Sequence, residues 1–483
     1  MISRRGLLIG GVAAGLLGSC TNADRRFVAV DGPEVRAAEA ARPIGRLVEA
    51  RLQAEVSEVD LGGQVVSGWT YGGRIPGRPI RVSAGDGLKV TVVNRLSQET
   101  SVHWHGIALR NDADGVPMIT QQPIKAGSEY VYQFAVAHPG TYWLHPHTGM
   151  QLDRGLYAPL IVDDPHEPMS YDDEWIVVLD DWLGIDPETK LAQLKRGAMR
   201  GGMMGSAAAG GSSLLAGSGG DVQYPHFLLN GRTATDPEVY QGKPGHRVRI
   251  RFINAGADTT FRVAVGGHQM TVTHTDGYPV RPVQTDALLI AMGERYDVLV
   301  TLADGLFPLV ALAEGKDGNA FALIRTGPGA AVAGSVRPAE LQRRLVRYPE
   351  MNATEAVALQ PRRLDRTIRL SLTGGMMGYD WGFNGRGFDH SRALKDAAEI
   401  VAGERVRLEF ANATMMYHPV HLHGHTFALN DVSGPRKDTA IVLPGQTIAA
   451  IFDAFNPGRW MVHCHNAYHA DSGMMTMIGY RQA

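Results

Sequence analysis

"NPGRWMVHCHNAYHADSGMM", residues 456–475, places one cysteine between two histidines near the end of a 483-residue chain. The apolar run "GRWMV" follows a Pro-Gly turn, which predicts a strand. Successive side chains of a strand point to opposite faces, so His463 and His465 face one way and Cys464 faces the other. A buried cysteine in a strand usually serves as a small hydrophobic residue. Two metal sites, one on each face of the strand, account better for the flanking histidines.

Further ligands for both faces occur elsewhere in the chain. His469 and Met474 follow Cys464 on a predicted loop that can return to the cysteine side. Thiolate, imidazole and a weak thioether are the ligands of an electron-transfer copper site. On the other face, eight clustered imidazoles imply several metal ions, because burying unpaired polar rings is costly. These eight form the pairs His103/His105, His145/His147, His421/His423 and His463/His465, and His418 and His425 flank the third pair.

The four pairs belong to an internal repeat. "HPGTYWLHPH" at 138–147 matches "NPGRWMVHCH" at 456–465, and "SVHWHG" at 101–106 matches "PVHLHG" at 419–424. The early and late parts of the chain are therefore predicted to be copies of one β-unit, each contributing two histidine pairs.

A third copy is visible in the middle of the chain. "GHRVRIRFIN" at 245–254 has the pattern of "GERVRLEFAN" at 403–412. The middle copy has no His-x-His pair. His268 and His274 lie near the equivalent place, and we interpret both as satisfied core or surface histidines.

These motifs, in this order, resemble those of three-domain multicopper oxidases, the superfamily of laccases and bacterial copper-efflux oxidases. The resemblance covers about residues 50–483. It implies four copper ions: a type 1 copper in the third domain, and one type 2 and two type 3 coppers between the first and third domains. Carried over by motif, the type 1 ligands are His418, Cys464, His469 and axial Met474, the type 2 ligands are His103 and His421, and the type 3 ligands are His105, His145, His147, His423, His463 and His465.

Length and composition predict an all-β chain. The length suits about three domains, and abundant Gly and Pro between short strand-like runs are typical of β-sandwiches. The resemblance implies that these are three consecutive cupredoxin-like Greek-key domains. We expect them at 47–165, 166–335 and 364–483, with a linker at 336–363. A low-complexity stretch at about 195–220 is predicted to be a mobile loop that packs no core.

The N-terminus, "MISRRGLLIGGVAAGLLGSC", has the features of an export signal. Ser3, Arg4 and Arg5 before a short apolar run are typical of the twin-arginine pathway. The run from 6 to 18 is too short to span a bilayer. This pathway carries folded proteins, which suits a chain with a complex metal centre.

"LGSC" resembles a lipobox, so Cys20 is predicted to become a lipidated first residue. The alternative is an ordinary signal with an incidental cysteine. A lipid would anchor the protein on the outer face of the cytoplasmic membrane, in the periplasm or cell envelope, with 21–46 as a tether. Lipoprotein copper-resistance oxidases of actinobacteria are similar in these features. Because Cys20 is assigned to lipid and Cys464 to copper, we expect no disulfide.

The resemblance implies one-electron oxidation of a substrate coupled to four-electron reduction of O2 to water. Electrons would pass from Cys464 through the backbone to His463 and His465. Asp114 matches an acidic residue near the type 2 copper in related oxidases, which implies a proton relay, although a turn Asp before Gly is the simpler reading. Ala470 replaces a Glu that many bacterial relatives carry. We interpret Asp438 as a structural partner of a ligand.

Methionine pairs suggest the substrate. Thioethers favour Cu(I), and Met416 lies two residues before His418, where copper-efflux oxidases carry a substrate Cu(I) ligand. Thr414 replaces their nearby Asp. Core packing explains any single pair, but the set favours Cu(I) over a purely phenolic substrate. The pairs are Met203/Met204, Met376/Met377, Met415/Met416 and Met474/Met475.

Other function classes stay open on sequence alone. One is a general laccase acting on phenols, with O2 and a small aromatic reductant as partners; Fe(II) and Mn(II) are further candidate substrates. Others are a copper-binding buffer and a structural member with degenerate copper sites. A buffer needs no Cys464 between two histidines, and a degenerate member would lack several ligands. A formal net charge of −2, without a basic patch among aromatics, gives nucleic-acid binding no support.

Overall fold

Six β-sheets, stacked in three pairs, form the computed structural model, which describes residues 26–199 and 210–482. This confirms the predicted all-β class of three successive β-sandwich units. The signal residues Ser3, Arg4 and Arg5 and the predicted lipidation site Cys20 lie outside the described residues. Within the described ranges, no helix is long and apolar enough to cross a membrane.

The first unit lies between residues 47 and 163. Leu88, Val90 and Val92 alternate along its central strand and are fully buried between the two sheets. One sheet has the order β2 (Val65–Tyr71), β1 (Leu47–Asp60), β4 (Gly87–Asn94), β6 (Glu129–Ala135), and the other has the order β3 (Ile80–Ser83), β8 (Ala158–Asp163), β7 (Gly140–His145), β5 (His103–His105).

The second unit follows between residues 173 and 325. One of its two sheets has the strand order β12 (His226–Leu229), β9 (Asp173–Trp182), β14 (Arg247–Asn254), β19 (Arg295–Thr301), β16 (Met270–Thr275), β17 (Tyr278–Thr285). The other sheet has the order β13 (Glu238–Gln241), β21 (Asn319–Arg325), β20 (Leu306–Ala313), β15 (Phe261–Val265), β18 (Leu288–Ile290). Helix α2 (Pro187–Met199) and the small hairpin of β10 (Gly211–Ser212) and β11 (Gly217–Ser218) belong to the long connection after β9.

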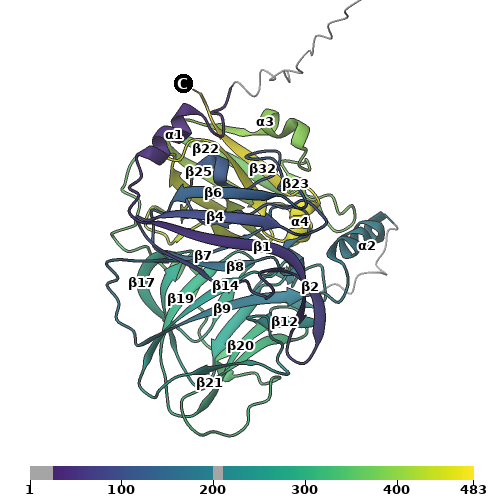
Figure 1. Ribbon diagram of the computed structural model, residues 1–483, viewed down its shortest axis with the longest axis vertical. Coiled ribbons are helices and arrows are strands. Elements are labelled where there is room, and N and C mark those ends of the chain that lie inside the picture. The colour runs from purple at the N-terminus through teal and green to yellow at the C-terminus, as the bar shows by residue number, and fades with distance from the viewer. Residues whose placement is uncertain (1–25, 200–209, 483) are drawn as a thin grey trace, which may run out of the picture.

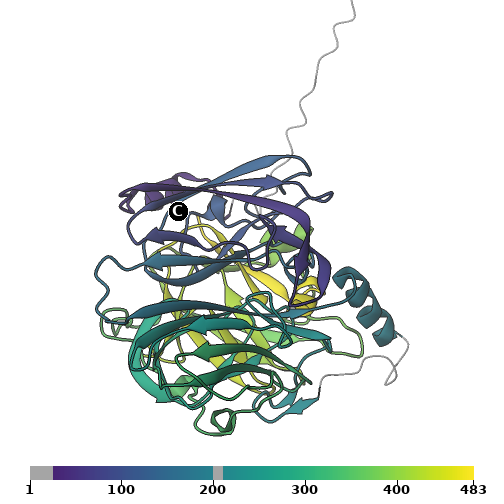
Figure 2. The ribbon, with the colours of Figure 1, turned by 60° about the horizontal axis from the view of Figure 1, so that its bottom comes forward.

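The third unit closes the chain. One of its two sheets has the strand order β23 (Gly382–Phe383), β22 (Arg366–Thr373), β25 (Arg405–Asn412), β30 (Thr447–Asp453), β27 (Phe427–Leu429), β28 (Arg436–Lys437). The other sheet has the order β24 (Ala398–Ile400), β32 (Met475–Tyr480), β31 (Arg459–Cys464), β26 (His418–Leu422), β29 (Thr439–Val442). The short helix α4 (Ala467–Asp471) connects β31 to β32, and the short helix α3 (Ala393–Asp396) packs against β32. Figures 1 and 2 show the purple and blue strands of the first unit and the yellow strands of the third together, with the teal second unit beneath them.

One asparagine recurs at the end of the equivalent strand in each unit. Asn94, Asn254 and Asn412 each donate two side-chain hydrogen bonds to main-chain carbonyls and accept one from the amide two residues on. β14 and β25 also pair in the same way, each parallel to one neighbour and antiparallel to the other. The middle copy inferred from the sequence is thus a structural repeat. In the third unit, Asn412 fixes the carbonyls of Met416 and Val442, next to His418.

Residues 27–42 pack against the fold, so the predicted tether over 21–46 is wrong for this part. The Phe27 ring lies against Gly479, and the Val28 amide donates to the Tyr480 carbonyl at 2.8 Å. Helix α1 (Pro33–Ala40) buries Val35, and Figure 1 shows it beside the third unit. The charged, Ala-rich composition hid this role, because only a few apolar side chains carry the docking.

The predicted mobile loop at 195–220 also differs from the structure. Its first residues continue α2, and its last residues form the β10–β11 hairpin. Leu215 is fully buried against Met292 and Tyr417, so this Gly-rich segment does pack a core. The signal in "GSSLLAGSGG" was the apolar pair, which the surrounding glycines obscured. Residues 200–209, with Met203 and Met204, lie outside the described residues.

Docking of the N-terminal segment should stabilise the protein. We expect Phe27→Ala to lower the free energy of unfolding by about 3 kcal/mol, because Phe27 is 1% exposed and truncation leaves a cavity over Gly479. Denaturant unfolding followed by tryptophan fluorescence measures the change. Leu47→Ala, at a residue 42% exposed, is the matched control and should cost less than about 1 kcal/mol. Equal, small effects of both variants would contradict the docking.

Candidate metal centre

Eight imidazoles from the four His-x-His pairs converge between the first and third units. The ladders that carry them are equivalent: His103 lies opposite His145 in β5–β7, as His421 lies opposite His463 in β26–β31. The two units face each other so closely that the His103 and His423 rings stack at 3.8 Å. The His105 and His421 rings do the same, also at 3.8 Å.

Ring nitrogens point at one another across this space. Nε2 of His423 and Nε2 of His463 are 3.0 Å apart, and Nε2 of His103 and Nε2 of His421 are 3.4 Å apart. Nδ1 of His105, Nε2 of His145 and both nitrogens of His465 are buried without a hydrogen-bond partner. Such orphaned lone pairs are costly unless metal ions take them. Three groups have ligand atoms within 4.8 Å of one another: His103/His105/His145, His103/His421/His423 and His147/His423/His463.

Oxygen acceptors hold the outward nitrogens of six of the eight rings, which fixes the tautomer and orientation of those six. Asp114 serves two rings: its carbonyl accepts from His103 Nδ1 at 2.9 Å, and its Oδ2 accepts from His423 Nδ1 at 2.9 Å. Main-chain carbonyls of Pro146 and Cys464 accept from His145 and His463, respectively.

Asp438 holds two more rings and connects the centre to the second unit. Its Oδ1 lies 2.9 Å from His105 Nε2, and its carbonyl accepts from His421 Nδ1 at 2.9 Å. Arg295 of β19 forms a bidentate pair with the Asp438 carboxylate at 2.8 and 2.6 Å. Arg295 also donates to the Thr141 carbonyl of the first unit, so one buried guanidinium joins all three units. The expected structural role of Asp438 agrees with these contacts.

A second group forms on the opposite face of β31. Cys464 Sγ lies 3.6 Å from His418 Nδ1 and 3.7 Å from His469 Nδ1. The two Nδ1 atoms are 3.0 Å apart, and all three residues are fully buried. Met474 is fully buried, and its carbonyl accepts from the Cys464 amide at 3.0 Å. A thiolate, two imidazoles and a nearby thioether fit copper in an electron-transfer geometry.

The remote nitrogens of this pair are also anchored. His418 Nε2 lies 2.7 Å from Thr414 Oγ1. His469 Nε2 lies 3.0 Å from Asp221 Oδ2, a carboxylate that also accepts from the Tyr379 hydroxyl at 2.6 Å. Asp221 follows the Gly-rich segment of the second unit, and no sequence pattern singled it out.

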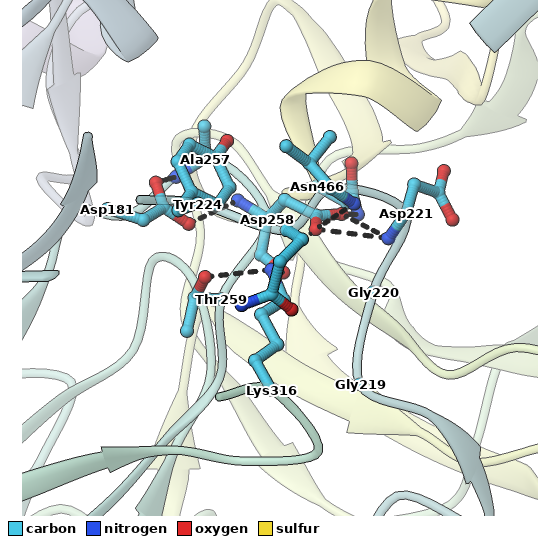
Figure 3. A network of polar contacts seen from close by, with 12 residues as sticks. Asp181, Gly219, Gly220, Asp221, Tyr224, Ala257, Asp258, Thr259, Lys316 and Asn466 are labelled. Atoms are coloured by element: carbon cyan, nitrogen blue, oxygen red, sulfur yellow. Dashed lines mark hydrogen bonds and ion pairs between the residues drawn. The ribbon is translucent and has the colours of Figure 1, made fainter. Parts of the chain in front are cut away.

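The second unit supports the loop that carries His469 (Figure 3), although none of its described residues supplies a histidine or cysteine to either group. Asn466 caps helix α4 by accepting from the amides of Tyr468 and His469. Its amide donates to Asp258 Oδ1 at 2.5 Å, and Lys316 Nζ lies 2.6 Å from the other carboxylate oxygen. Asp258 also accepts from the Asp221 amide, so Asp221 and Asp258 belong to one hydrogen-bond network.

Burial sets the charge of the imidazoles. Desolvation lowers the pKa of seven of the eight clustered rings, so they are neutral near pH 7 and can act as ligands. His469 differs: burial opposes the charge, but the Asp221 carboxylate raises the pKa of His469 to about 10. The seven rings are His105, His145, His147, His421, His423, His463 and His465.

Some residues predicted from sequence lie elsewhere. Met416 is buried with 5% exposure, whereas Met415 is 85% exposed, so a substrate arriving from solvent meets Met415 first, and the suggested contact at Met416 stays a prediction. His425 bonds to the Tyr480 hydroxyl at 2.7 Å and joins neither group. His268 and His274 are hydrogen-bonded away from the centre, as expected.

Comparison with known proteins gives consistent matches. Family models described as multicopper oxidase match residues 53–167, 173–329 and 361–482. "Multicopper oxidase MmcO" of Mycobacterium tuberculosis is 48% identical, over 99% of this chain and 96% of that one. A "Copper resistance protein A homolog" of Pseudomonas syringae pv. tomato is 30% identical, over 87% and 90%. The crystal structure of Fet3p, a multicopper oxidase that functions in iron import, matches with a TM-score of 0.77 at 22% identity over 90% of each chain, a likeness of fold.

Buried neutral histidines should make the copper-free protein acid-sensitive. Histidines in the unfolded chain have a pKa of about 6.5. Below that pH the unfolded chain binds protons that the seven buried rings of the folded protein do not bind, so the free energy of unfolding falls as pH falls. His469, with its raised pKa, acts in the opposite sense as one group against seven. The free energy of unfolding, measured from pH 8 to 5, should therefore drop below about pH 6.5.

A variant that lacks one of the seven rings measures the contribution of that ring to the pH dependence. His145→Gln removes one ring whose pKa burial lowers, and should reduce the slope by up to about 1.4 kcal/mol per pH unit. A pH-independent stability of the copper-free protein would contradict the assigned neutral state.

Proposed function

Because the chain belongs to the multicopper oxidase family, we propose that it couples oxidation of a reducing substrate, chiefly Cu(I), to reduction of O2 to water. It is an oxidoreductase with oxygen as the electron acceptor. The observation that carries the finer proposal is the pair of ligand groups on the two faces of β31. Four bound coppers would supply one-electron transfer and O2 reduction. Relatives named for copper resistance support a role in that process.

The residues present fit the four predicted coppers. His418, Cys464 and His469 would hold the type 1 ion, with Met474 as a weak thioether donor. His103 and His421, whose Nε2 atoms face each other, would hold the type 2 ion. The remaining six rings would hold the type 3 pair: His105, His145, His147, His423, His463 and His465.

Strand β31 connects the two groups covalently. Cys464 belongs to one group, and its chain neighbours His463 and His465 belong to the other. The His463 ring also donates to the Cys464 carbonyl at 2.9 Å. Electrons entering near Cys464 therefore have a path of a few bonds to the larger cluster, and this role is assigned to Cys464.

Asp114 is the proposed source of protons. It is fully buried beside the cluster, with Oδ2 engaged by His423, and Oδ1 makes no hydrogen bond and lies 3.3 Å from His103 Nδ1. Buried neutral imidazoles that ligate metal cannot give up protons without changing their role. A carboxylic acid with one free oxygen at this place can accept a proton and pass it to a reacting oxygen.

Exposed thioethers support Cu(I) as substrate. Met377 and Met415, at 87% and 85% exposure, are the two most exposed large apolar side chains in the described part of the chain. Met415 adjoins Thr414, which anchors His418, and Met377 lies two residues before Tyr379, which anchors Asp221 behind His469. Soft thioether donors favour Cu(I) over harder ions.

The proposed location is the outer face of the cytoplasmic membrane, after twin-arginine export and lipidation of Cys20. Phe27, which is docked on the fold, follows Cys20 by seven residues. Seven residues span at most about 25 Å. A lipid at Cys20 would therefore hold the folded protein close to the membrane surface.

Asp114→Asn should separate proton delivery from ligand support. The amide oxygen can still accept from His423, so we expect normal copper content, but turnover should fall about 100-fold. Asp112→Asn, at a surface carboxylate paired with Arg110, is the matched control. Unchanged turnover would show that protons enter elsewhere, and loss of copper would show that Asp114 acts by holding His423.

Substrate preference is tested by the ratio of kcat/KM for Cu(I) to kcat/KM for a methoxyphenol. We expect Cu(I) to be preferred, and the double variant Met377→Leu/Met415→Leu to lower this ratio about tenfold through KM for Cu(I). A preference for the phenol that the variant does not alter would favour a general laccase.

The export proposal makes two separate predictions. Arg4→Lys/Arg5→Lys should leave the protein in the cytoplasm. Cys20→Ala should release it from the membrane fraction with its copper content unchanged. A Cys20→Ala protein that stays in the membrane fraction would exclude the lipid anchor.

A further inference from the structure

A cavity of about 270 Å³ leads from the surface to the eight-histidine cluster, and Cys464 also contributes to its lining. His145, His147, His463 and His465 line its inner end. Ala467 and Ala470 line its wall, and these small side chains keep it open. The cavity therefore gives direct access to imidazoles that are otherwise enclosed by two β-sandwich units.

Soft donors line the same cavity in sequence from mouth to floor. Met475 lies opposite His463 in the antiparallel β31–β32 ladder, so the two side chains share one face of the sheet. Met461, two residues before His463 on β31, shares that face as well. Met118 and His390 line the outer part and are exposed.

Met118 is unusual in two respects. It is a large apolar side chain with 61% exposure, and its backbone has φ +64°, the left-handed region that L side chains rarely adopt. Its amide donates to the Gln121 carbonyl at 2.8 Å, which fixes this conformation. Neither burial nor backbone preference explains a methionine here, whereas a thioether at the cavity mouth has a chemical use.

Charge at the cavity suits a cation. Glu99 and Asp471 contribute carboxylates, and among the described residues that line it none is lysine or arginine. The cavity thus combines carboxylates, thioethers and imidazoles. That sequence of donors, increasingly nitrogen-rich toward the cluster, fits a monovalent soft metal ion that is handed inward.

We propose that this cavity is the loading route by which Cu(I) reaches the eight-histidine cluster, with Met118 and His390 as the entry ligands and Met475 as the transfer ligand to His463. The route rests on the proposed copper centre but is separate from the substrate site near Met415, on the other face of β31. Met475 lies directly across the ladder from His463, so its thioether is placed to pass an ion to the His463 ring.

The test uses full-length, copper-loaded protein. Under anaerobic conditions the protein is reduced, and bicinchoninate captures released Cu(I) at a measured rate. After the chelator and the reductant are removed, Cu(I) or Cu(II) is added back. Total copper is followed with time, and the visible absorption of the thiolate site is measured separately after each sample is reoxidised in air. We expect Met118→Leu/Met475→Leu to slow Cu(I) release from and return to the histidine cluster about tenfold, with the same final copper content.

Two controls make the result specific. Cu(II) return should be unaffected in the double variant, because thioethers bind Cu(II) weakly, and Met169→Leu, which removes a thioether outside the cavity, should load at the wild-type rate. Wild-type Cu(I) rates in the double variant would overturn the proposal. Equal slowing for Cu(I) and Cu(II) would also overturn it, by showing a steric effect. A wild-type protein that retains no copper at the cluster would instead refute the copper centre itself.

Discussion

Burial of eight neutral imidazoles between two β-sandwich units is the constraint on which the rest of the structure depends. His105, His145 and His465 bury a ring nitrogen without a hydrogen-bond partner, and oxygen acceptors hold the outward nitrogens of six of the eight rings. Asp114 and Asp438 provide this support from opposite sides, and Arg295 of the second unit neutralises Asp438. In the described part of the second unit no residue belongs to either ligand group, yet the Arg295 guanidinium and the Asp221 and Asp258 carboxylates align groups from the other units. The three-unit architecture follows from this need for support behind the rings.

The two-residue period of a strand solves the second problem, which is to join two different metal groups. Cys464 faces one side of β31 while His463 and His465 face the other, so the groups are chain neighbours without sharing a ligand. His469 must then return to the cysteine side, and Asn466 makes this possible by capping α4 immediately after the strand. Asp258 holds Asn466 from the second unit, which places the geometry of the cysteine group under the control of a distant sandwich.

The sequence predicted the site correctly where the ligand residues occur at a fixed spacing in a motif. His-x-His pairs, the Cys464 motif and the repeat of strand patterns predicted the fold class and brought together the same residues that cluster in space. It failed where support comes from single polar residues, such as Asp221 and Arg295, whose partners at the site are more than 140 residues away and follow no period. It also failed where a few apolar residues act inside a biased composition, as with Phe27 in a charged segment and Leu215 among glycines. The position of Met416 two residues before His418 correctly indicated a methionine close to the cysteine group. It did not indicate which of the two adjacent methionines is exposed, and in the structure this is Met415.

The central claim is that Cys464 and its two flanking histidines serve different copper groups. Electronic absorption and electron paramagnetic resonance of copper-loaded Cys464→Ser, with total copper measured on the same sample, test this most directly. The account predicts loss of the intense thiolate-to-copper band and loss of turnover, while copper stays bound at the histidine cluster. A variant that remains blue, or one that loses the histidine-bound copper together with the colour, would contradict it.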